Sequence, residues 1–183
     1  MKTLYIILGV ILIAFIIVQL FAMSGQRNIE TYPYEVNKKY DAFEIRDYEA
    51  SLFTSVKLSV KEYKEASSKG FSILAGYIFG DNESNEKIAM TSPVVMEIGD
   101  TSKMMFMVPK AYSIKDLPNP NNDRILFEKQ DEKIVAAIQF DGWANDDKIE
   151  KYKAILKEEL AKEKLQHTNK FTYLGYNPPY ELF

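Results

Sequence analysis

The chain has 183 residues, enough for one ordinary domain with a hydrophobic core. Its 23 basic and 26 acidic residues give a net charge of -3 without the basic excess that nucleic-acid binding requires, so we expect no nucleic-acid partner. The absence of cysteine excludes disulfides, thiolate metal sites and cysteine nucleophiles.

The first 24 residues predict a membrane segment. Leu4–Met23 is uncharged, with Gln19 as its only strongly polar side chain, and a helix needs about 20 such residues to cross the hydrocarbon core. A cleaved signal peptide is the alternative, but its apolar run is shorter, about 7 to 15 residues. We therefore expect an uncleaved single-pass anchor over residues 1–24. The few flanking basic residues favour a soluble domain outside the cytoplasm.

A short polar linker, residues 25–28, joins this segment to residues 29–183, which have the composition of a globular domain. Within the domain, Phe43–Glu49 and Leu52–Leu58 alternate between apolar and polar side chains. Such alternation is typical of half-buried strands. We expect these two segments to pair with each other.

A helix is predicted next, because apolar residues recur at helical spacing from Tyr63 to Ile78. Ser59 is the predicted N-cap, and Gly80 is the glycine expected just past the last turn. Gly70 weakens such a helix by roughly 0.5 to 1 kcal/mol relative to alanine, unless close packing requires it.

Two further strands are predicted at residues 87–98 and 103–108, followed by a loop rich in proline and asparagine. Pro93 interrupts the first of these strands. Because proline cannot donate to a strand ladder, we expect this strand to pair through Thr91, to kink or bulge at the proline and then to resume.

The second half of the domain repeats this order of elements. Residues 125–129 and 134–140 alternate like strands, and residues 149–160 carry a helical apolar stripe that Asn145 or Asp146 is able to cap. A last strand is predicted at residues 171–176. Two strand-strand-helix-strand units, offset by roughly 80 residues, predict an α+β fold: a sheet or barrel flanked by two helices.

Side chains suited to catalysis are scarce. His167 is the only histidine, and it lies in a polar run with no nucleophile near it in sequence. Ser72 and Ser92 lie outside any G-x-S-x-G pattern, and no glycine pattern for a phosphate cofactor occurs. We therefore expect neither an enzyme nor a metal site.

Methionines are concentrated in the central predicted strands. Thioether side chains are adaptable and polarisable, and they suit contact with a flat apolar ligand or a heme iron. Most methionines at strand spacing, however, are ordinary core residues. The residues concerned are Met90, Met96, Met104, Met105 and Met107.

Seven stretches of the domain form a recognisable series: YPYEV, FEIRDYE, GFSILAGYIFGDN, KIAMTSPV, PNPNND, FDGWA and GYNPP. With these motifs, from Ile29 to Tyr180, the chain resembles the SOUL or heme-binding-protein family. The resemblance implies a distorted, pseudo-twofold β-barrel flanked by two helices. It also implies binding of heme or another tetrapyrrole.

The resemblance further implies a ligand groove over the first predicted helix, where apolar side chains contact the tetrapyrrole and basic residues bind its propionates. In this sequence Ser68 and Gly76 stand where the basic residues are expected, so a nearby lysine has to replace them. The predicted tetrapyrrole-binding residues are Phe71, Leu74, Ala75, Lys69 and Met90, with Lys64 as an alternative to Lys69.

Two departures from the family pattern concern the iron and the barrel edge. In some animal members a histidine has been taken as the axial ligand of the iron, and Asp47 occupies that position in this sequence. A carboxylate is a hard ligand that replaces imidazole poorly. Members also commonly continue past GYNPP into one more strand. We therefore expect either an open barrel edge or an edge covered by Tyr34–Lys39.

Two hypotheses for function follow. The favoured one is non-enzymatic binding of heme or another tetrapyrrole by a membrane-anchored domain. The alternative is a ligand-free interaction or scaffold protein of the same fold, held at the membrane to meet a protein partner that the sequence does not identify.

Overall fold

The computed structural model describes residues 29–99 and 101–176, which contain two helices and eight strands. The chain divides into two compact units, Met1–Glu30 and Thr31–Phe183, and these elements all belong to the second. In chain order they are β1 (Tyr34–Lys39), β2 (Glu44–Tyr48), β3 (Ser51–Leu58), α2 (Tyr63–Ile78), β4 (Val94–Glu97), β5 (Ser102–Met107), β6 (Ile125–Gln130), β7 (Lys133–Ala137), α3 (Asp146–Lys162) and β8 (Thr172–Gly175).

The predicted anchor, residues 1–24, and the linker, residues 25–28, lie outside the described residues. Within the described ranges, no helix combines the length and the apolar composition that crossing a bilayer requires.

A long bent ribbon of strands forms the centre of the fold. β2 and β3 are separated only by Glu49 and Ala50, and they run antiparallel to β7 and β6. Tyr48 pairs with Lys133 on one side of the bend, and Ser51 pairs with Gln130 on the other, so the register continues through it. The first strand of each predicted repeat therefore pairs with the second strand of the other repeat.

The prediction that Phe43–Glu49 and Leu52–Leu58 pair with each other is wrong, because the chain bends between them instead of reversing. Alternation has a period of two residues, and it identifies the buried face of a strand without identifying the neighbouring strand.

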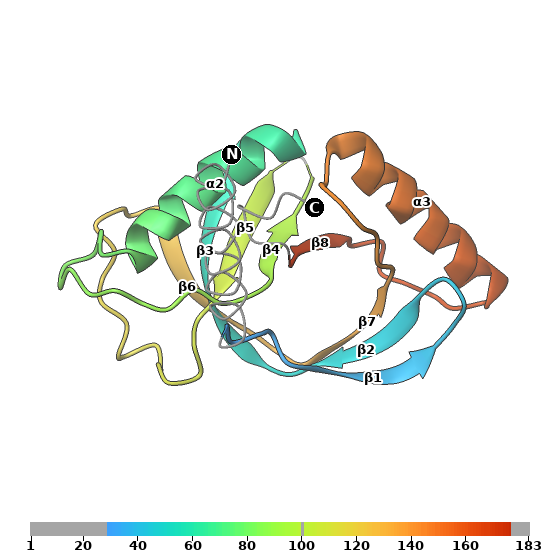
Figure 1. Ribbon diagram of the computed structural model, residues 1–183, viewed down its shortest axis with the longest axis horizontal. Helices are drawn as coiled ribbons and strands as arrows, with labels where there is room; N and C mark the ends of the chain where they lie inside the picture. Colours follow the sequence, from blue (N-terminus) through green and yellow to red (C-terminus); the bar gives the residue numbers. More distant parts are fainter. Residues whose placement is uncertain (1–28, 100, 177–183) are drawn as a thin grey trace, which may run out of the picture. The chain divides into compact units, whose positions relative to one another are not determined.

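The predicted barrel is not closed in the described part of the chain. The strands form a three-stranded sheet, β1-β2-β7, and a five-stranded sheet, β6-β3-β5-β4-β8, as Figure 1 shows. Closure requires the outermost strands to pair, but β1 pairs only with β2 and β8 pairs only with β4. Tyr34–Lys39 is thus itself an edge strand of the smaller sheet.

Helix α2 packs on β3 and β5 of the larger sheet (Figure 1). Gly70 makes this close approach possible, because a Cβ atom there would lie 3.0 Å from both Leu58 Cδ1 and Met104 Cβ. Gly80 follows the helix at a φ of 116°, as predicted. The predicted N-cap, Ser59, is wrong: the N-cap position is Glu62, whose side chain makes no capping hydrogen bond.

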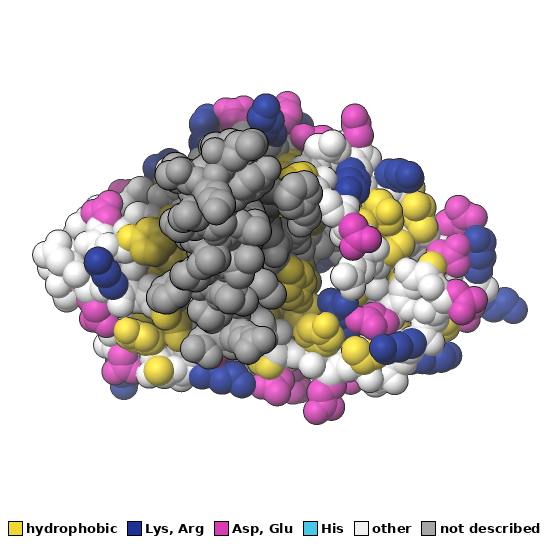
Figure 2. All heavy atoms as spheres, in the orientation of Figure 1, with side chains coloured by type: hydrophobic (Ala, Val, Ile, Leu, Met, Phe, Trp, Pro, Cys, Tyr) yellow, Lys and Arg dark blue, Asp and Glu magenta, His cyan; other side chains and the backbone are white. Residues whose placement is uncertain are grey.

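Helix α3 begins as predicted, with the Asn145 side chain accepting a hydrogen bond from the Lys148 N–H at 2.8 Å. Leu156 and Leu160 pack with Phe43 in a small core cluster. The solvent-exposed face of α3 carries ion pairs, such as the one between Lys153 and Glu150. Where Figure 2 draws described residues, basic and acidic side chains are interspersed.

The predicted strand at residues 87–98 is regular only in β4, Val94–Glu97. The peptide bond between Ser92 and Pro93 is cis, and residue 92 makes an isolated bridge to Thr31. The Thr91 hydroxyl donates to the Met107 carbonyl at 2.7 Å. The sequence predicts backbone pairing through Thr91, but the bond that the structure shows to Met107 comes from the Thr91 side chain.

The methionines of β4 and β5 are core residues. Met96 and Met104 belong to the cluster beneath α2, and Met105 and Met107 belong to a cluster on the opposite face of the sheet. All four side chains are almost completely buried. Ordinary core packing is therefore the interpretation that the structure supports for these four residues.

Candidate functional site

Phe71 lies at the border between the buried and exposed faces of α2. Its ring meets Phe106 of β5 edge to face, with centroids 5.4 Å apart. Tyr77, which is buried on the same helix, packs against Phe127 of β6. Because the sheet order is β6-β3-β5-β4-β8, Phe71 lies on the side of α2 that faces β4 and β8.

The structure brings four of the five predicted binding residues into one hydrophobic cluster. Leu74 and Ala75 are buried in it, whereas Phe71 and Met90 are half-buried against it. Lys69 is separate: it is exposed on α2 and forms an ion pair with Glu65 one turn away. Of the apolar members, Phe71 and Met90 thus retain the most exposed surface.

Lys64, more than Lys69, shares a side of α2 with Phe71. A separation of seven residues is close to two full turns, so Lys64 falls about 10 Å from Phe71 along the same stripe. Lys69 precedes Phe71 by two residues and is rotated by about 200°. Lys64 is exposed and has no ion-pair partner within the described residues. It is the better placed of the two cations to bind an anionic group beside Phe71.

Asp47 is not part of this region. It lies in β2 of the three-stranded sheet, whereas α2 packs on the five-stranded one. The Asn37 side chain donates to its Oδ2 atom at 3.1 Å, and its Oδ1 atom is buried without a hydrogen-bond partner. The family resemblance linked two regions to the ligand, the position of Asp47 and the groove over α2. The first is in the three-stranded sheet, and the second lies against the five-stranded sheet.

An aromatic cluster links the start of α2 to α3, since Phe140 stacks on Tyr173 as well as on Tyr152. Tyr63 contacts Tyr173 of β8 edge to face at 5.2 Å, and Phe140 stacks on Tyr152 at 4.6 Å. Burial, with Tyr173 beside it, raises the pKa of the Tyr63 phenol above its usual range. Tyr63 is thus a neutral side chain at physiological pH, which suits an apolar environment.

A second aromatic cluster lies on the face of the larger sheet turned away from α2. The Tyr32 and Tyr48 rings are 4.5 Å apart. Arg46 donates from Nη1 to the Tyr48 hydroxyl at 3.3 Å and from Nε to Glu44 at 2.6 Å. The Tyr32 hydroxyl is buried and has no hydrogen-bond partner. Burial, with Tyr48 nearby, raises the pKa of Tyr32 to about 12.

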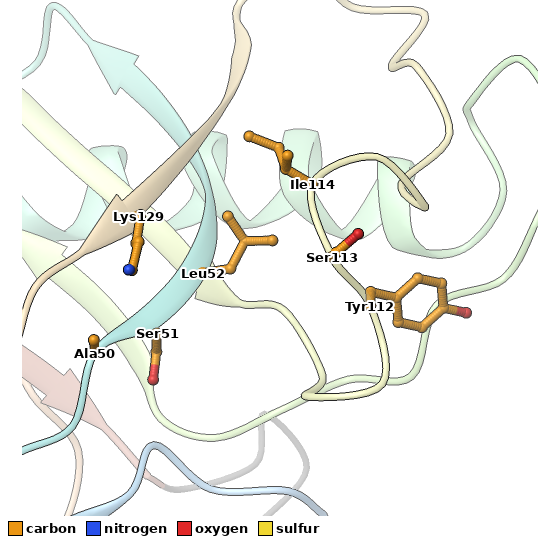
Figure 3. A pocket seen from close by; sticks show the side chains of 7 residues that line it. All are labelled: Ala50, Ser51, Leu52, Tyr112, Ser113, Ile114 and Lys129. Atoms are coloured by element: carbon orange, nitrogen blue, oxygen red, sulfur yellow. The ribbon is translucent and has the colours of Figure 1, made fainter.

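A shallow pocket of about 370 Å³ opens where β3 begins, and we call it the β3-start pocket. Figure 3 shows the Leu52 side chain between Lys129 of β6 on one side and the loop that carries Ser113 and Ile114 on the other. The lining residues are Ala50, Ser51, Leu52, Tyr112, Ser113, Ile114 and Lys129.

The sequence does not reveal this pocket, because the lining residues come from three segments far apart in the chain. The strand register, which pairs Leu52 with Lys129, brings two of these segments together, and the loop that carries Ile114 completes the lining. Lys64, in contrast, was within reach of sequence reasoning, since a helical period of 3.6 residues places it on the side of Phe71.

Comparison with known proteins identifies relatives over most of the chain. A family model described as SOUL heme-binding protein matches residues 29–183. Heme-binding protein 1 of Xenopus tropicalis is 31% identical, covering 75% of this chain and 76% of the relative. Heme-binding protein 2 of Mus musculus is 28% identical, with 82% and 77% covered, and heme-binding protein 1 of Bos taurus is 27% identical, with 83% and 85% covered.

Proposed function

Because the chain belongs to the SOUL heme-binding protein family, we propose that residues 29–183 bind heme or another tetrapyrrole without catalysing a reaction. The observation that carries the proposal is the match of the family model to the whole domain. Relatives named heme-binding proteins 1 and 2 support the ligand class.

The proposed site is the Phe71 side of α2. Phe71 offers part of its ring to the flat face of a porphyrin, and Leu74 and Ala75 form the packed layer beneath it. Met90, half-buried against the same cluster, is the proposed second apolar contact. A lysine on α2 binds a propionate: Lys64 is proposed first, because Lys69 is rotated away and is paired with Glu65.

The fit is good for the ring and poor for the iron. The apolar face of Phe71 suits the flat porphyrin ring, and a lysine beside it suits a propionate carboxylate. Among the five proposed contacts only the thioether of Met90 is able to ligate iron, none is a histidine, cysteine or tyrosine, and Asp47 lies in the other sheet. We therefore propose that contacts with the face of the porphyrin ring, and not a bond to iron, provide most of the affinity. Heme and metal-free protoporphyrin should then bind about equally well.

An absorbance titration of the full-length protein in lipid nanodiscs, against empty nanodiscs, tests this proposal. We expect a saturable Soret shift with hemin and with protoporphyrin IX. Phe71→Glu should weaken both at least tenfold, because a charge replaces an apolar contact face. Phe79→Glu is the matched control, since Phe79 is 60% exposed at the end of the same helix. No saturable shift with either ligand would contradict the proposal.

We also propose that residues 1–24 anchor the domain in a membrane, with the domain outside the cytoplasm. The uncharged run Leu4–Met23 supports the anchor. Carbonate extraction of membranes and sequencing of the mature N-terminus test it. Release of the protein by carbonate, or a mature N-terminus near Gly25, would reject an uncleaved anchor. Protease protection in sealed vesicles would report the orientation.

A further inference from the structure

The β3-start pocket has an apolar floor and a fixed wall. Leu52 and Lys129 are directly paired across β3 and β6, so their side chains leave the same face of the sheet. Ile114 is 52% exposed at the opposite wall, and Tyr112 lies beside it in the chain. An exposed isoleucine at the wall of a pocket supplies apolar surface that a ligand is able to cover.

Hydrogen bonds hold the wall in place. The Ser113 N–H and hydroxyl both donate to Asp116 Oδ2, at 2.8 and 2.6 Å. The Tyr112 N–H donates to the Pro109 carbonyl at 3.0 Å, and its hydroxyl donates to Glu86 at 2.9 Å. A preformed wall reduces the ordering cost of binding. Ile114 is thus presented by a loop that has its own hydrogen bonds.

The charged side chain in the pocket lining is basic. The lining includes Lys129 and no aspartate or glutamate. A second pocket of about 370 Å³ shares Ala50, Ser51, Leu52 and Tyr112 with it and also has no acid in its lining. Its additional lysine, Lys110, is paired with Glu49 at 3.6 Å, so the positive charge that favours an anion comes from Lys129. Lys129 has no ion-pair partner within the described residues. Charge complementarity therefore favours a ligand that carries an anionic group.

We propose that the β3-start pocket binds a small amphipathic carboxylate, of the class of medium-chain fatty acids. The apolar chain lies over Leu52 and Ile114, and the carboxylate binds the ammonium group of Lys129. A volume of about 370 Å³ is at the small end of ligand pockets, which matches a single alkyl chain better than a large ring system. This site is separate from the proposed tetrapyrrole site, because its lining includes no residue of α2.

Photo-crosslinking of the full-length protein in nanodiscs tests this inference. The probe is a ten-carbon acid with a diazirine in its chain, and the matched neutral probe is the corresponding alcohol. We expect the acid to label peptides that contain Leu52 or Ile114, and decanoate to compete with it. Lys129→Gln should reduce this labelling about three- to fivefold, with little effect on the alcohol, because it removes one ion pair.

Two controls separate this inference from the proposed function. Lys57→Gln removes an exposed lysine of β3 outside the pocket and should leave the labelling unchanged. Phe71→Glu should also leave it unchanged, and Lys129→Gln should leave the hemin titration unchanged. Equal labelling by acid and alcohol, equal labelling of wild type and Lys129→Gln, or crosslinks spread over other peptides would each overturn the inference.

Discussion

The carboxylate of Asp146, the first residue of α3, accepts a hydrogen bond at 2.6 Å from the backbone N–H of Tyr63, the first residue of α2. A helix leaves its first N–H groups without partners inside the helix. The Glu62 side chain makes no capping bond, so one helix caps the other across 83 positions in sequence. A negative charge between two helix N-termini is also favourable for both helix dipoles.

Replacing Asp146 should therefore destabilise the domain more than its position on the surface suggests. We expect Asp146→Ala to lower the free energy of unfolding by about 1 to 2 kcal/mol in urea denaturation. Asp147→Ala is the matched control, since it removes an acid from the same first turn. Equal losses in the two variants would show that helix-dipole charge, and not the bond to Tyr63, is responsible.

The close contact at Gly70 gives a second prediction. Alanine is a better helix former by about 1 kcal/mol, but a Cβ atom at this position would lie 3.0 Å from Met104 Cβ and Leu58 Cδ1. We expect overpacking to dominate and Gly70→Ala to destabilise the protein by about 1 to 2 kcal/mol net. Thermal unfolding would measure it beside Ser72→Ala, an exposed site on α2. A gain in stability from Gly70→Ala would mean that Leu58 and Met104 shift to accommodate the added Cβ atom at little cost.

The unpartnered hydroxyl of Tyr32 gives a third prediction. Tyr32→Phe removes a buried polar group that makes no hydrogen bond, so stability at neutral pH should be unchanged or slightly higher. Tyr48→Phe should cost about 1 kcal/mol, since the Tyr48 hydroxyl accepts from Arg46 and lies 3.4 Å from that of Tyr176. A larger loss in Tyr32→Phe than in Tyr48→Phe would contradict this assignment.

The raised pKa of Tyr32 also predicts how stability depends on alkaline pH. Its pKa is about 12 in the folded protein and 10.0 without the protein environment. The folded state thus holds the phenol proton more tightly, and this contribution is complete below pH 10 and is lost as the pH rises through about 12. Tyr32→Phe should flatten the decline by up to about 1.4 kcal/mol per pH unit. Urea denaturation at pH 9, 10 and 11 would measure the slope, and an unchanged slope would reject the prediction.

The position of Lys64 gives a prediction for the proposed tetrapyrrole site. Lys64→Gln should weaken protoporphyrin IX about three- to fivefold, because an ion pair with a propionate is lost, and should leave the dimethyl ester unaffected. Lys69→Gln is the matched variant and should affect neither, since Lys69 is rotated by about 200° from Phe71 and is paired with Glu65. The reverse order of effects in fluorescence titrations would assign the propionate to Lys69.

The sequence by itself determined both helices, most of the strands and the family. Periodicity was sufficient for α2 and α3, because a helix that packs on one side must repeat its apolar residues every 3.6 positions. Gly80 and Asn145 were identified as helix-end residues because their roles depend on backbone geometry within a few residues. The ordered motifs identified the SOUL family for the same reason: each is read from a contiguous stretch.

Only the tertiary structure decided which elements meet. Alternation could not show that β2 pairs with β7, because every strand with one buried face has the same period of two residues. It could not place Lys129 beside Leu52, and no local rule connects Asp146 to Tyr63 across 83 positions. These contacts follow from the bend between β2 and β3 and from the strand register, which are set by the packing of the whole domain.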